Sequence, residues 1–254
     1  MSETPKAWLA AAGLALAALG ALGGWWWQSR DDAEVSATPG KLAAAGIDGT
    51  EKAAIEALVR DYILEHPEIL PEAMQRLQSR GDAAVVRAQR AALETPFAGA
   101  VLGNPSARLT LVEFSDYACG YCRQSVGDVR ALIAAHPDLR IVVRELPILS
   151  SASGDAAEMA LAAAGQGRYA AFHDAMFAGA RPDAASIAAA ARAARVRPAA
   201  ATPEIAAEIS ANLDLARKLG INGTPAWVIG DRLLVGAVGR EALEAAIGEA
   251  RDRT

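Results

Sequence analysis

The fold can be inferred outward from residues 111–122, LVEFSDYACGYC, in which a short apolar run leads directly into two cysteines. Cys119 and Cys122 are the only cysteines of the chain, and two residues separate them. A pair with this spacing, placed after a strand and at the start of a helix, is typical of a redox-active dithiol, because one helical turn brings the two residues within disulfide distance. The sequence therefore predicts a dithiol where a strand meets a helix.

Four short apolar runs predict strands, at residues 109–114, 140–146, 226–229 and 232–235. Residues 119–136 predict a helix between the first two strands, so a parallel strand–helix–strand unit is the expected arrangement. Gly230-Asp231 predicts a hairpin turn between the last two strands. The alanine-rich region at about 150–220 predicts a helical block. We therefore expect an α/β fold with a helical insertion over residues 96–254.

The composition excludes several classes of protein. A hydrophobic content of 52% in 254 residues is enough for a sizeable core, which excludes a disordered chain. Lys and Arg number 25 against 30 Asp and Glu, so the chain lacks the basic excess that nucleic-acid binding needs. Two cysteines are too few for a disulfide-stapled scaffold or a four-cysteine zinc site.

The N-terminal 30 residues predict a membrane anchor or a signal peptide. Residues 8–27, WLAAAGLALAALGALGGWWW, carry no charge and would span roughly 30 Å as a helix, which matches the hydrocarbon core of a bilayer. The closing tryptophans favour an uncleaved anchor, and Lys6 before the span favours a catalytic domain on the periplasmic side of a bacterial inner membrane. Cleavage at Ala15-Leu16-Ala17, which would leave a soluble periplasmic protein, is the alternative.

The next two segments differ in pattern. Residues 31–50 are polar and contain proline and glycine, which predicts a linker, whereas residues 51–95 predict a helical segment. Its apolar residues recur at spacings of three and four and form one stripe: Ile55, Leu58, Val59, Tyr62 and Ile63. We expect a break at His66-Pro67 and a bend at Gly81. A segment this short cannot form a hydrophobic core of its own, so it either caps the main domain or self-associates through the stripe.

The position of each cysteine predicts its role. Cys119 meets the unpaired N–H groups and the positive dipole end of the predicted helix, which favour a thiolate, so we expect it to be the exposed nucleophile. Cys122, one turn further, should be more buried and should resolve the mixed disulfide. Glu113, inside the apolar strand, could relay a proton to or from Cys122, unless it faces water at an edge. Half of a zinc site and a purely structural disulfide are the competing interpretations of the pair.

Gly223-Thr224-Pro225 precedes a predicted strand far along the chain. From these residues alone the tripeptide is an ordinary turn. A cis bond before Pro225 would set the Thr224 backbone beside the dithiol, where its N–H and C=O groups could pair with an extended substrate as an added strand.

Taken together, LVEFSDYACGYC and GINGTPAWVIG (residues 220–230) resemble the DsbA-like branch of the thioredoxin superfamily. This resemblance implies a thioredoxin fold whose helical domain is inserted at about 150–220. The functional positions of that family fall on these residues: the buried glutamate on Glu113, the nucleophile on Cys119, the resolving cysteine on Cys122, and the substrate contacts on Gly120, Tyr121, Thr224 and the cis-proline Pro225.

Residues 58–77, LVRDYILEHPEILPEAMQRL, are similar to the N-terminal region of ScsC-type proteins, the suppressors of copper sensitivity. In some of these proteins the region drives trimerisation and confers disulfide isomerase behaviour. A homotrimer is therefore one expectation that follows from the resemblance.

The chain departs from the strongly oxidising DsbA proteins between its cysteines. Those proteins carry Pro-His, whereas Gly120-Tyr121 offers no cationic donor to a thiolate, and Thr224 resembles the isomerases; both features favour an isomerase or reductase over an oxidase. We expect no cofactor. The expected partners are unfolded or misoxidised exported proteins and a membrane redox partner, either a DsbD-like reductant or a DsbB-like oxidant. Sequestration of Cu(I) by the two thiolates is the alternative function.

Overall fold

The computed structural model describes residue 46 and residues 48–197 and 202–252. The chain divides between Glu72 and Ala73 into two compact units. The predicted membrane segment at 8–27, with its alternative cleavage site, lies outside the described residues, as does most of the predicted linker at 31–50. In the part of the chain that is described, no helix is both long enough and apolar enough to cross a membrane.

The described part of the first unit is helical. Helix α2 (Gly49–Glu65) begins at Asp48, whose carboxylate accepts the N–H of Glu51 at 2.9 Å, while the Glu51 carboxylate accepts the N–H of Asp48 at 3.1 Å. This reciprocal capping box fixes the helix start. The helix ends at His66, directly before Pro67, as predicted. Helix α2 buries none of its residues, and the stripe residues Ile55, Leu58, Val59 and Tyr62 are exposed.

Helix α3 (Ile69–Glu94) runs without interruption through Gly81, so the predicted bend at this residue is wrong. One glycine lowers helix propensity by only about 1 kcal/mol, and the alanines and long polar side chains around it compensate. Towards its C-terminus, Val86 and Leu93 are buried in the second unit. The C-terminal half of α3 is therefore part of the core of that unit.

The second unit contains a five-stranded sheet, in the order β1-β3-β2-β4-β5, among its described residues. The strands are β1 (Val101–Gly103), β2 (Leu109–Ser115), β3 (Leu139–Glu145), β4 (Ala226–Ile229) and β5 (Arg232–Val235). Strands β2 and β3 are parallel and are joined by helix α4 (Gly120–Ala135), which confirms the predicted strand–helix–strand unit. The hairpin of β4 and β5 is also confirmed. Strand β1, antiparallel to β3, is too short to give a periodic signal and was not predicted.

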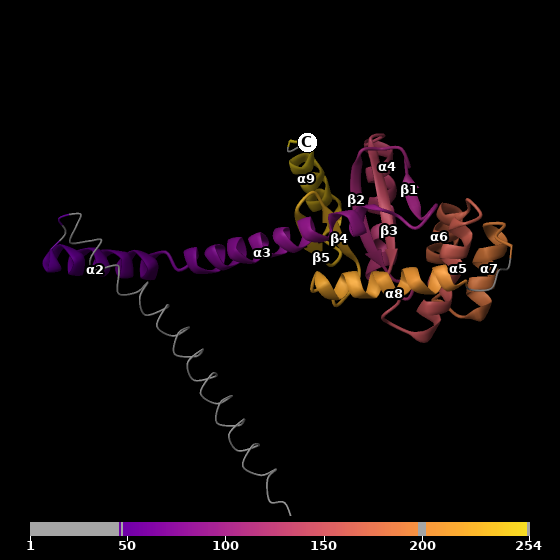
Figure 1. Ribbon diagram of the computed structural model, residues 1–254, viewed down its shortest axis with the longest axis horizontal. Coiled ribbons are helices and arrows are strands. Elements are labelled where there is room, and N and C mark those ends of the chain that lie inside the picture. The colour runs from indigo at the N-terminus through magenta and orange to yellow at the C-terminus, as the bar shows by residue number, and fades with distance from the viewer. Residues whose placement is uncertain (1–45, 47, 198–201, 253–254) are drawn as a thin grey trace, which may run out of the picture. The chain divides into compact units, whose positions relative to one another are not determined.

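The remaining helices follow β3 and the hairpin. They are α5 (Ser151–Ala164), α6 (Tyr169–Ala178), α7 (Ala184–Ala193), α8 (Pro203–Lys218) and α9 (Gly239–Arg251). Helices α5, α6 and α7 pack against one another to one side of the sheet, whereas α8 runs along the sheet (Figure 1). The helical block expected at about 150–220 therefore consists of a three-helix group followed by a helix that also covers the sheet.

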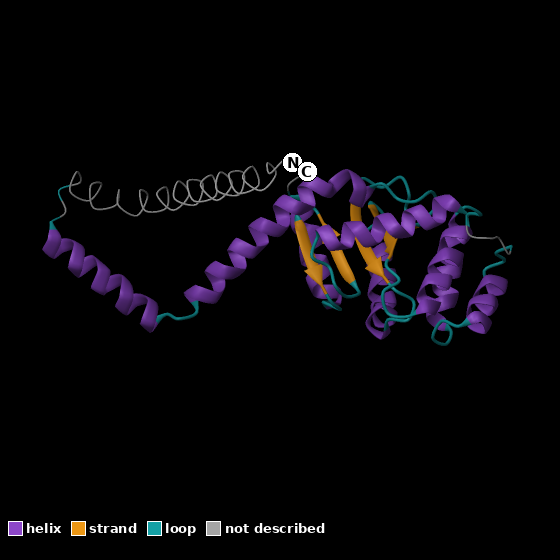
Figure 2. Cartoon of the chain, turned by 60° about the horizontal axis from the view of Figure 1, so that its bottom comes forward, coloured by secondary structure: helices purple, strands orange, loops and turns teal. Residues whose placement is uncertain are grey.

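Helices cover both faces of the sheet (Figure 2). On one face, Leu111 and Trp227 belong to a buried cluster with α4, α9 and the three-helix group. On the other, Val112 and Phe114 pack with Leu93 of α3 and with residues of α8. Successive residues of β2 thus enter opposite cores, as the two-residue period of a strand requires.

Buried Arg144 of β3 fastens the C-terminal end of α3 to the sheet. Its guanidinium donates hydrogen bonds to the carbonyl oxygens of Ala92, Leu93 and Thr95. It also donates to Oε1 of Glu208, on α8, at 2.7 Å. The last carbonyl groups of a helix have no partner within the helix, so Arg144 satisfies acceptors that α3 leaves open. Burial lowers the pKa of Arg144, and Glu208 opposes that shift.

Candidate active site: the Cys119–Cys122 dithiol

Buried Asp116 organises the loop between β2 and α4. Its Oδ1 accepts the N–H of Ala118 at 2.8 Å, and its carbonyl oxygen accepts the N–H of Cys119 at 2.9 Å. Its Oδ2 accepts the N–H groups of Ile148 and Leu149, in the loop after β3, at 2.9 and 3.0 Å. Asp116 thus holds together the two loops that follow the parallel strands. Sequence reasoning missed this residue, although an aspartate just before a helix start is a known turn signal.

Cys119 is the N-cap of α4, and its Sγ accepts the N–H of Cys122 at 3.2 Å. The Cys119 thiol also donates to the carbonyl oxygen of Thr224 at 3.2 Å. Both cysteines are free; Cys119 is 5% exposed and Cys122 is 0% exposed. The predicted order of accessibility is confirmed. The prediction of an openly exposed Cys119 is wrong, because the Thr224 loop lies against its sulfur atom.

The Thr224–Pro225 peptide bond is cis, as expected. It directly precedes β4, whose first residue, Ala226, pairs with Phe114 near the end of β2. This pairing carries the Thr224 backbone to the end of the sheet at which Cys119 lies. The two residues are 105 positions apart in the sequence, and the pairing of β2 with β4 brings them together.

Glu113 lies within β2 and is 2% exposed. The predicted buried position is therefore confirmed, and the alternative of a glutamate that faces water at an edge is excluded. Its neighbours Val112 and Phe114 belong to the opposite core, so Glu113 points to the face that also holds the dithiol. Burial raises the pKa of Glu113 to about 8, and the Ser115 hydroxyl opposes only part of this rise. Its Oε2 has no hydrogen-bond partner among the described residues. Such a carboxyl group holds its proton at neutral pH and can exchange it.

The Cys122 thiol resists ionisation. Burial raises its pKa well above the ordinary range, the backbone of Asp116 opposes this rise, and the charge of Glu113 adds to it. A protonated Glu113 therefore makes a Cys122 thiolate less costly than an ionised Glu113 does. The site combines a slightly exposed cysteine, at a helix N-terminus, with a fully buried cysteine whose protonation depends on a neighbouring acid.

Exposed apolar side chains accompany the dithiol. Outside α3, the exposed large hydrophobic residues described in the second unit are Tyr121, Ile148, Leu149 and Val235, which we call the apolar rim. Tyr121 lies between the cysteines and is 63% exposed, and Asp116 holds the loop that carries two more members. Val235 pairs with Ala226, directly after Pro225. The space beside Gly120 is open. The site is therefore bordered by surface suited to apolar segments.

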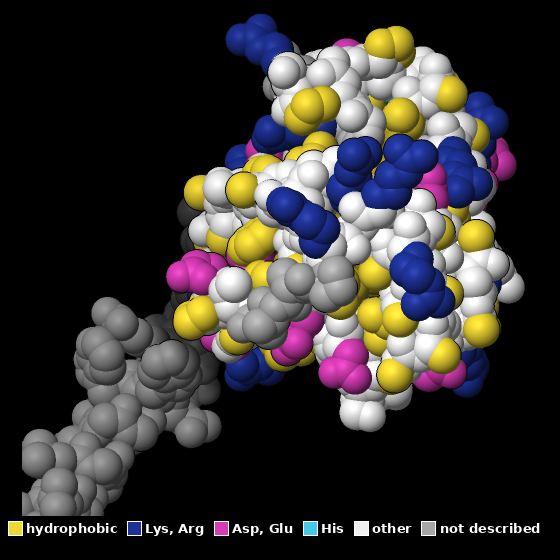
Figure 3. Space-filling model, turned by 90° about the vertical axis from the view of Figure 1, so that its right-hand side faces the viewer, with side chains coloured by type: hydrophobic (Ala, Val, Ile, Leu, Met, Phe, Trp, Pro, Cys, Tyr) yellow, Lys and Arg dark blue, Asp and Glu magenta, His cyan; other side chains and the backbone are white. Residues whose placement is uncertain are grey.

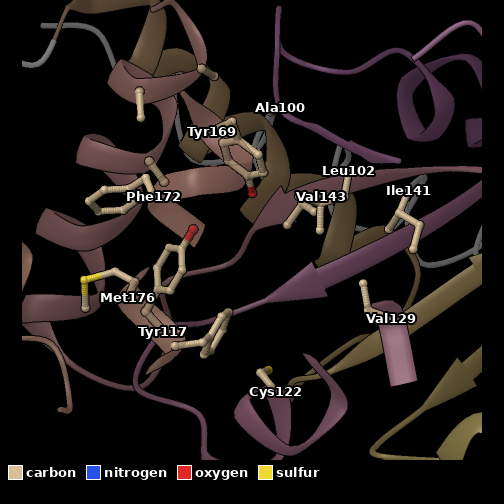
Figure 4. Close-up of a cluster of buried hydrophobic side chains, with 14 of the residues drawn as sticks. Ala100, Leu102, Tyr117, Cys122, Val129, Ile141, Val143, Tyr169, Phe172 and Met176 are labelled. Carbon is tan, nitrogen blue, oxygen red and sulfur yellow. The ribbon is translucent and has the colours of Figure 1, made fainter. Parts of the chain in front are cut away.

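A second buried polar cluster lies on the same side of the sheet. Oε1 of Glu145, at the end of β3, accepts hydrogen bonds from the hydroxyl groups of Tyr117 at 3.1 Å and Tyr169 at 2.7 Å. Figure 4 shows these two hydroxyl groups turned toward the same space. Burial raises the pKa of Glu145 to about 8, against the opposing effect of the two phenols. Sequence reasoning missed Glu145 because its partners come from distant elements, which no local pattern reveals.

The described parts of the chain contain no group of three or more His, Cys, Asp or Glu residues placed to hold a metal ion. The dithiol supplies two sulfur ligands at most. One of them, Cys122, would have to ionise in a buried position before it could bind a metal.

Comparison with protein families identifies two regions of the chain. Residues 110–248 match the DSBA-like thioredoxin domain, which covers more than half of the 254 residues. Residues 51–84 match the N-terminal domain of the copper resistance protein ScsC. These matches confirm both parts of the resemblance that the motifs gave.

Solved structures of similar fold agree. A linker-deletion variant of Proteus mirabilis ScsC is 31% identical, with a TM-score of 0.65, and the match covers 82% of this chain and 98% of that one. A thioredoxin-like oxidoreductase from Silicibacter pomeroyi is 40% identical over 63% of this chain and 95% of that one, with a TM-score of 0.58. The thiol-disulfide exchange protein α-DsbA2 from Wolbachia pipientis is 26% identical over 68% and 97% of the two chains, with a TM-score of 0.64.

Among curated proteins, the Na(+)/H(+) antiporter NhaA 3 from Salinispora tropica is 33% identical over 157 residues, and NhaA 1 from Salinispora arenicola is 33% identical over 158. The matched part covers 58% and 59% of this chain, and the chain spans only 24% of each antiporter. The assignment rests on the family matches and on the solved structures, which are matched over 98%, 95% and 97% of their own length. This chain belongs to the DSBA-like thioredoxin family, and its dithiol domain is that of a thiol-disulfide oxidoreductase.

Proposed function

We propose that the protein catalyses thiol-disulfide exchange on exported proteins, with Cys119 as the nucleophile and Cys122 as the resolving cysteine. The observation that carries this proposal is the pairing at the start of α4, where the N–H of Cys122 is directed at the more accessible Cys119 sulfur. A sulfur that accepts a helix N-terminal N–H is stabilised when it carries negative charge. Cys119 is therefore the sulfur that meets the substrate.

The exchange proceeds through a mixed disulfide. In the reducing direction, the Cys119 thiolate attacks a substrate disulfide, one Cys119–substrate bond forms, and one substrate sulfur leaves as a thiolate. Cys122 then transfers its proton to Glu113, which accepts it only in its ionised form, and attacks Cys119, which releases the second substrate thiolate. In the oxidising direction the steps reverse, so a protonated Glu113 returns its proton to the Cys122 sulfur as the Cys119–Cys122 disulfide opens.

The proposed substrate is an extended polypeptide. The apolar rim borders the dithiol, and the Thr224 backbone beside Cys119 is suited to pair with a passing chain. Tyr121 and Gly120 would contact the chain next to the attacked sulfur, with Pro225 below it. Figure 3 shows one face of the molecule, on which several Lys and Arg side chains lie close together across the upper half. Replacing Ile148 and Leu149 by serine should raise KM for a protein substrate more than it raises KM for glutathione.

We propose isomerase or reductase activity over oxidase activity. Gly120-Tyr121 supplies no positive charge to the Cys119 thiolate, which lowers oxidising power. The chain would then need a membrane reductant of the DsbD type, whereas an oxidase would need a DsbB-type partner. A similar solved structure from Salmonella is described as a periplasmic thioredoxin-like protein, which supports a periplasmic location for this domain. A membrane anchor in residues 1–30 remains our prediction.

Self-association through the N-terminal helices would suit an isomerase. In α2, Leu58, Val59 and Tyr62 are 69%, 50% and 53% exposed, and neighbouring exposed apolar side chains of this kind mark interaction surfaces. Leu70, Met74 and Leu77 of α3 are also exposed. The match of residues 51–84 to the ScsC N-terminal domain supports a homo-oligomer, and the resemblance suggests a trimer.

Three assays separate the possible directions. Insulin reduction measures reductase activity, refolding of scrambled ribonuclease measures isomerase activity, and oxidation of a reduced peptide measures oxidase activity. We expect the first two to exceed the third, and Cys119→Ala to abolish all of them. If Cys119→Ala retained any of these activities while Cys122→Ala lost it, the assigned roles would be reversed.

Cu(I) sequestration is the second candidate, because residues 51–84 match a domain named for copper resistance and the free dithiol offers two soft ligands. Titration of the reduced protein with Cu(I) under anaerobic conditions tests it. Tight one-to-one binding that is lost in both Cys119→Ala and Cys122→Ala would support it, and the absence of binding would exclude it.

A further inference from the structure

Two buried carboxyl groups face the same side of the sheet from neighbouring strands. In the parallel pairing of β2 with β3, Glu113 lies opposite Val143 and Ser115 lies opposite Glu145. Side chains two residues apart on a strand share a face, so Glu113, Ser115 and Glu145 all point into the core that holds the dithiol. Glu113 and Glu145 are 2% and 1% exposed, respectively. Two carboxylates placed in this way oppose each other's ionisation, and the charge of Glu113 raises the pKa of Glu145.

The two carboxyl groups differ in their hydrogen-bond donors. Oε1 of Glu145 accepts two hydroxyl groups, from Tyr117 at 3.1 Å and from Tyr169 at 2.7 Å. Oε2 of Glu113 has no partner among the described residues, and the Ser115 hydroxyl is the one side-chain donor that lowers the pKa of Glu113. Because O–H donors stabilise a carboxylate more than a neutral carboxyl group, a single negative charge on this pair is better held by Glu145.

No nearby cation alters this ranking. Asp116 and Cys122 also face the pair, and an ionised form of either would only add negative charge. His173 of α6 packs against Tyr117 and Tyr169, but burial lowers its pKa to about 4, so it is neutral at neutral pH. Arg144 neighbours Glu145 on β3, but its guanidinium binds the end of α3 and Glu208 on the other face. In the described structure no ion pair joins Glu113 or Glu145 to a basic side chain.

We infer that Glu145, with its donors Tyr117 and Tyr169, is a positioning residue of the dithiol chemistry that takes the first negative charge of the carboxyl pair as the pH rises and thereby keeps the proton on Glu113 up to a higher pH. This inference rests on the proposed thiol-disulfide exchange. The retained proton is the one that passes from Glu113 to the Cys122 sulfur when the Cys119–Cys122 disulfide opens, which leaves a Cys122 thiol and a Glu113 carboxylate. Glu145 touches neither sulfur and acts only through Glu113.

Titration of the glutamate side-chain carboxyl carbons by ¹³C NMR tests the coupling on the full-length reduced protein. Glu113→Gln and Glu145→Gln identify the two signals. In Glu145→Gln, the titration midpoint of Glu113 should fall by about 1 pH unit or more, because the opposing charge is gone. In Tyr117→Phe/Tyr169→Phe it should also fall, because the charge then moves from Glu145 to Glu113. An unchanged Glu113 midpoint in Glu145→Gln would overturn the inference.

Controls separate coupling from a general loss of structure. Glu249→Gln removes an exposed carboxylate that pairs with Arg232, and it should leave the Glu113 midpoint where it is. A purely structural role for Glu145 predicts a lower thermal midpoint of unfolding with no change in the titration of Glu113. If Glu145→Gln does not fold, Tyr169→Phe decides the matter, since removal of one donor should lower the Glu113 midpoint by a smaller amount and an unmoved midpoint refutes the coupling.

The activity readout distinguishes this inference from the proposed function. The pH profile of insulin reduction should shift to lower pH in Glu145→Gln by the same amount as the NMR midpoint. The NMR titration needs no turnover, so the carboxyl coupling can be measured even in a protein without reductase activity. Loss of activity in the wild type would therefore refute the proposed function, and an unmoved midpoint would refute the role of Glu145.

Discussion

At the scale of single residues, the sulfur that reacts with substrate is distinct from the groups that donate and accept protons. Cys119 takes its position from the start of α4 and from Asp116, both of which are local in sequence. Cys122 and Glu113 share a buried environment that raises both of their pKa values. The start of α4 thus positions the cysteine that reacts with substrate, and the buried core holds the two groups that exchange a proton.

Replacement of Cys122 should trap the reaction half-way. In Cys122→Ser, the Cys119 sulfur can still attack a substrate disulfide, but no second thiol is present to resolve the product. Mixed disulfides with protein substrates should accumulate and should run at higher mass on non-reducing gels until reductant is added. Cys119→Ser is the matched control, and equal trapping by both variants would contradict the assignment.

Glu113 should make the folded protein less stable as pH rises. Its pKa is 4.5 in the unfolded chain and about 8 in the folded one, so between these values folding takes up a proton. Stability from this group is complete below pH 4.5 and falls by up to about 1.4 kcal/mol per pH unit as pH rises towards 8. Glu113→Gln should flatten the decline in urea unfolding free energy measured over this range.

The control for this experiment is Glu249→Gln, whose exposed carboxylate should leave the slope unchanged. Glu145 retains its own contribution in Glu113→Gln, so the slope should shrink without vanishing. A slope equal to that of the wild type would show that Glu113 is ionised in the folded protein at neutral pH.

At the scale of elements, buried Arg144 links three of them: β3, the end of α3, and α8. Arg144→Ala would leave the Glu208 carboxylate and the helix carbonyls without this partner in a mostly buried place, and should cost about 3–5 kcal/mol of unfolding free energy. Urea titration measures this cost. Arg217→Ala removes an exposed ion pair with Asp214 and should change the unfolding free energy by less than about 1 kcal/mol. Equal effects of the two variants would contradict the stabilising role of Arg144.

The elements also show how far sequence reasoning reaches. Strands β2 and β3, helix α4 and the β4–β5 hairpin follow from local apolar runs and turn residues, and the Glu113, Cys119 and Cys122 cluster follows from one continuous motif. The cis bond at Pro225 required the family resemblance, because the tripeptide alone is an ordinary turn. The predicted bend at Gly81 is wrong because the packing of α3, through Val86 and Leu93, outweighs the low helix propensity of one glycine.

Glu145 shows where such reasoning stops. Its donors lie 28 and 24 positions away, in the loop after β2 and in α6, and the contacts exist only once the sheet and the three-helix group have formed. The accessibility of Cys119 was misjudged for the same reason, since the Thr224 loop that covers its sulfur is 105 residues away. Local patterns thus identify the reacting atoms, and tertiary structure sets their surroundings.

At the scale of the whole molecule, the exposed stripe of α2 predicts self-association. Leu58→Asp places a charge in this stripe and should lower the mass of the protein in solution, measured by light scattering, while insulin reduction per chain is kept. Isomerase activity should fall with the mass if the assembly serves that function. Ala57→Asp is the matched control, because the helical period places residue 57 opposite the stripe. A monomeric wild type, or an equal effect of both variants, would contradict the prediction.

The hydrogen bond from the Cys119 thiol to the Thr224 carbonyl makes the Thr224 backbone, which is proposed to pair with substrate, sensitive to the redox state of the dithiol. That bond exists only while the sulfur bears hydrogen. Once Cys119 ionises or enters a disulfide, the Thr224 carbonyl loses this donor and becomes available to the amide of an incoming strand. When the thiol form returns, it can donate to the carbonyl oxygen again. Binding of the substrate backbone to Thr224 would accordingly weaken each time Cys119 returns to its thiol form, without any movement of a lid.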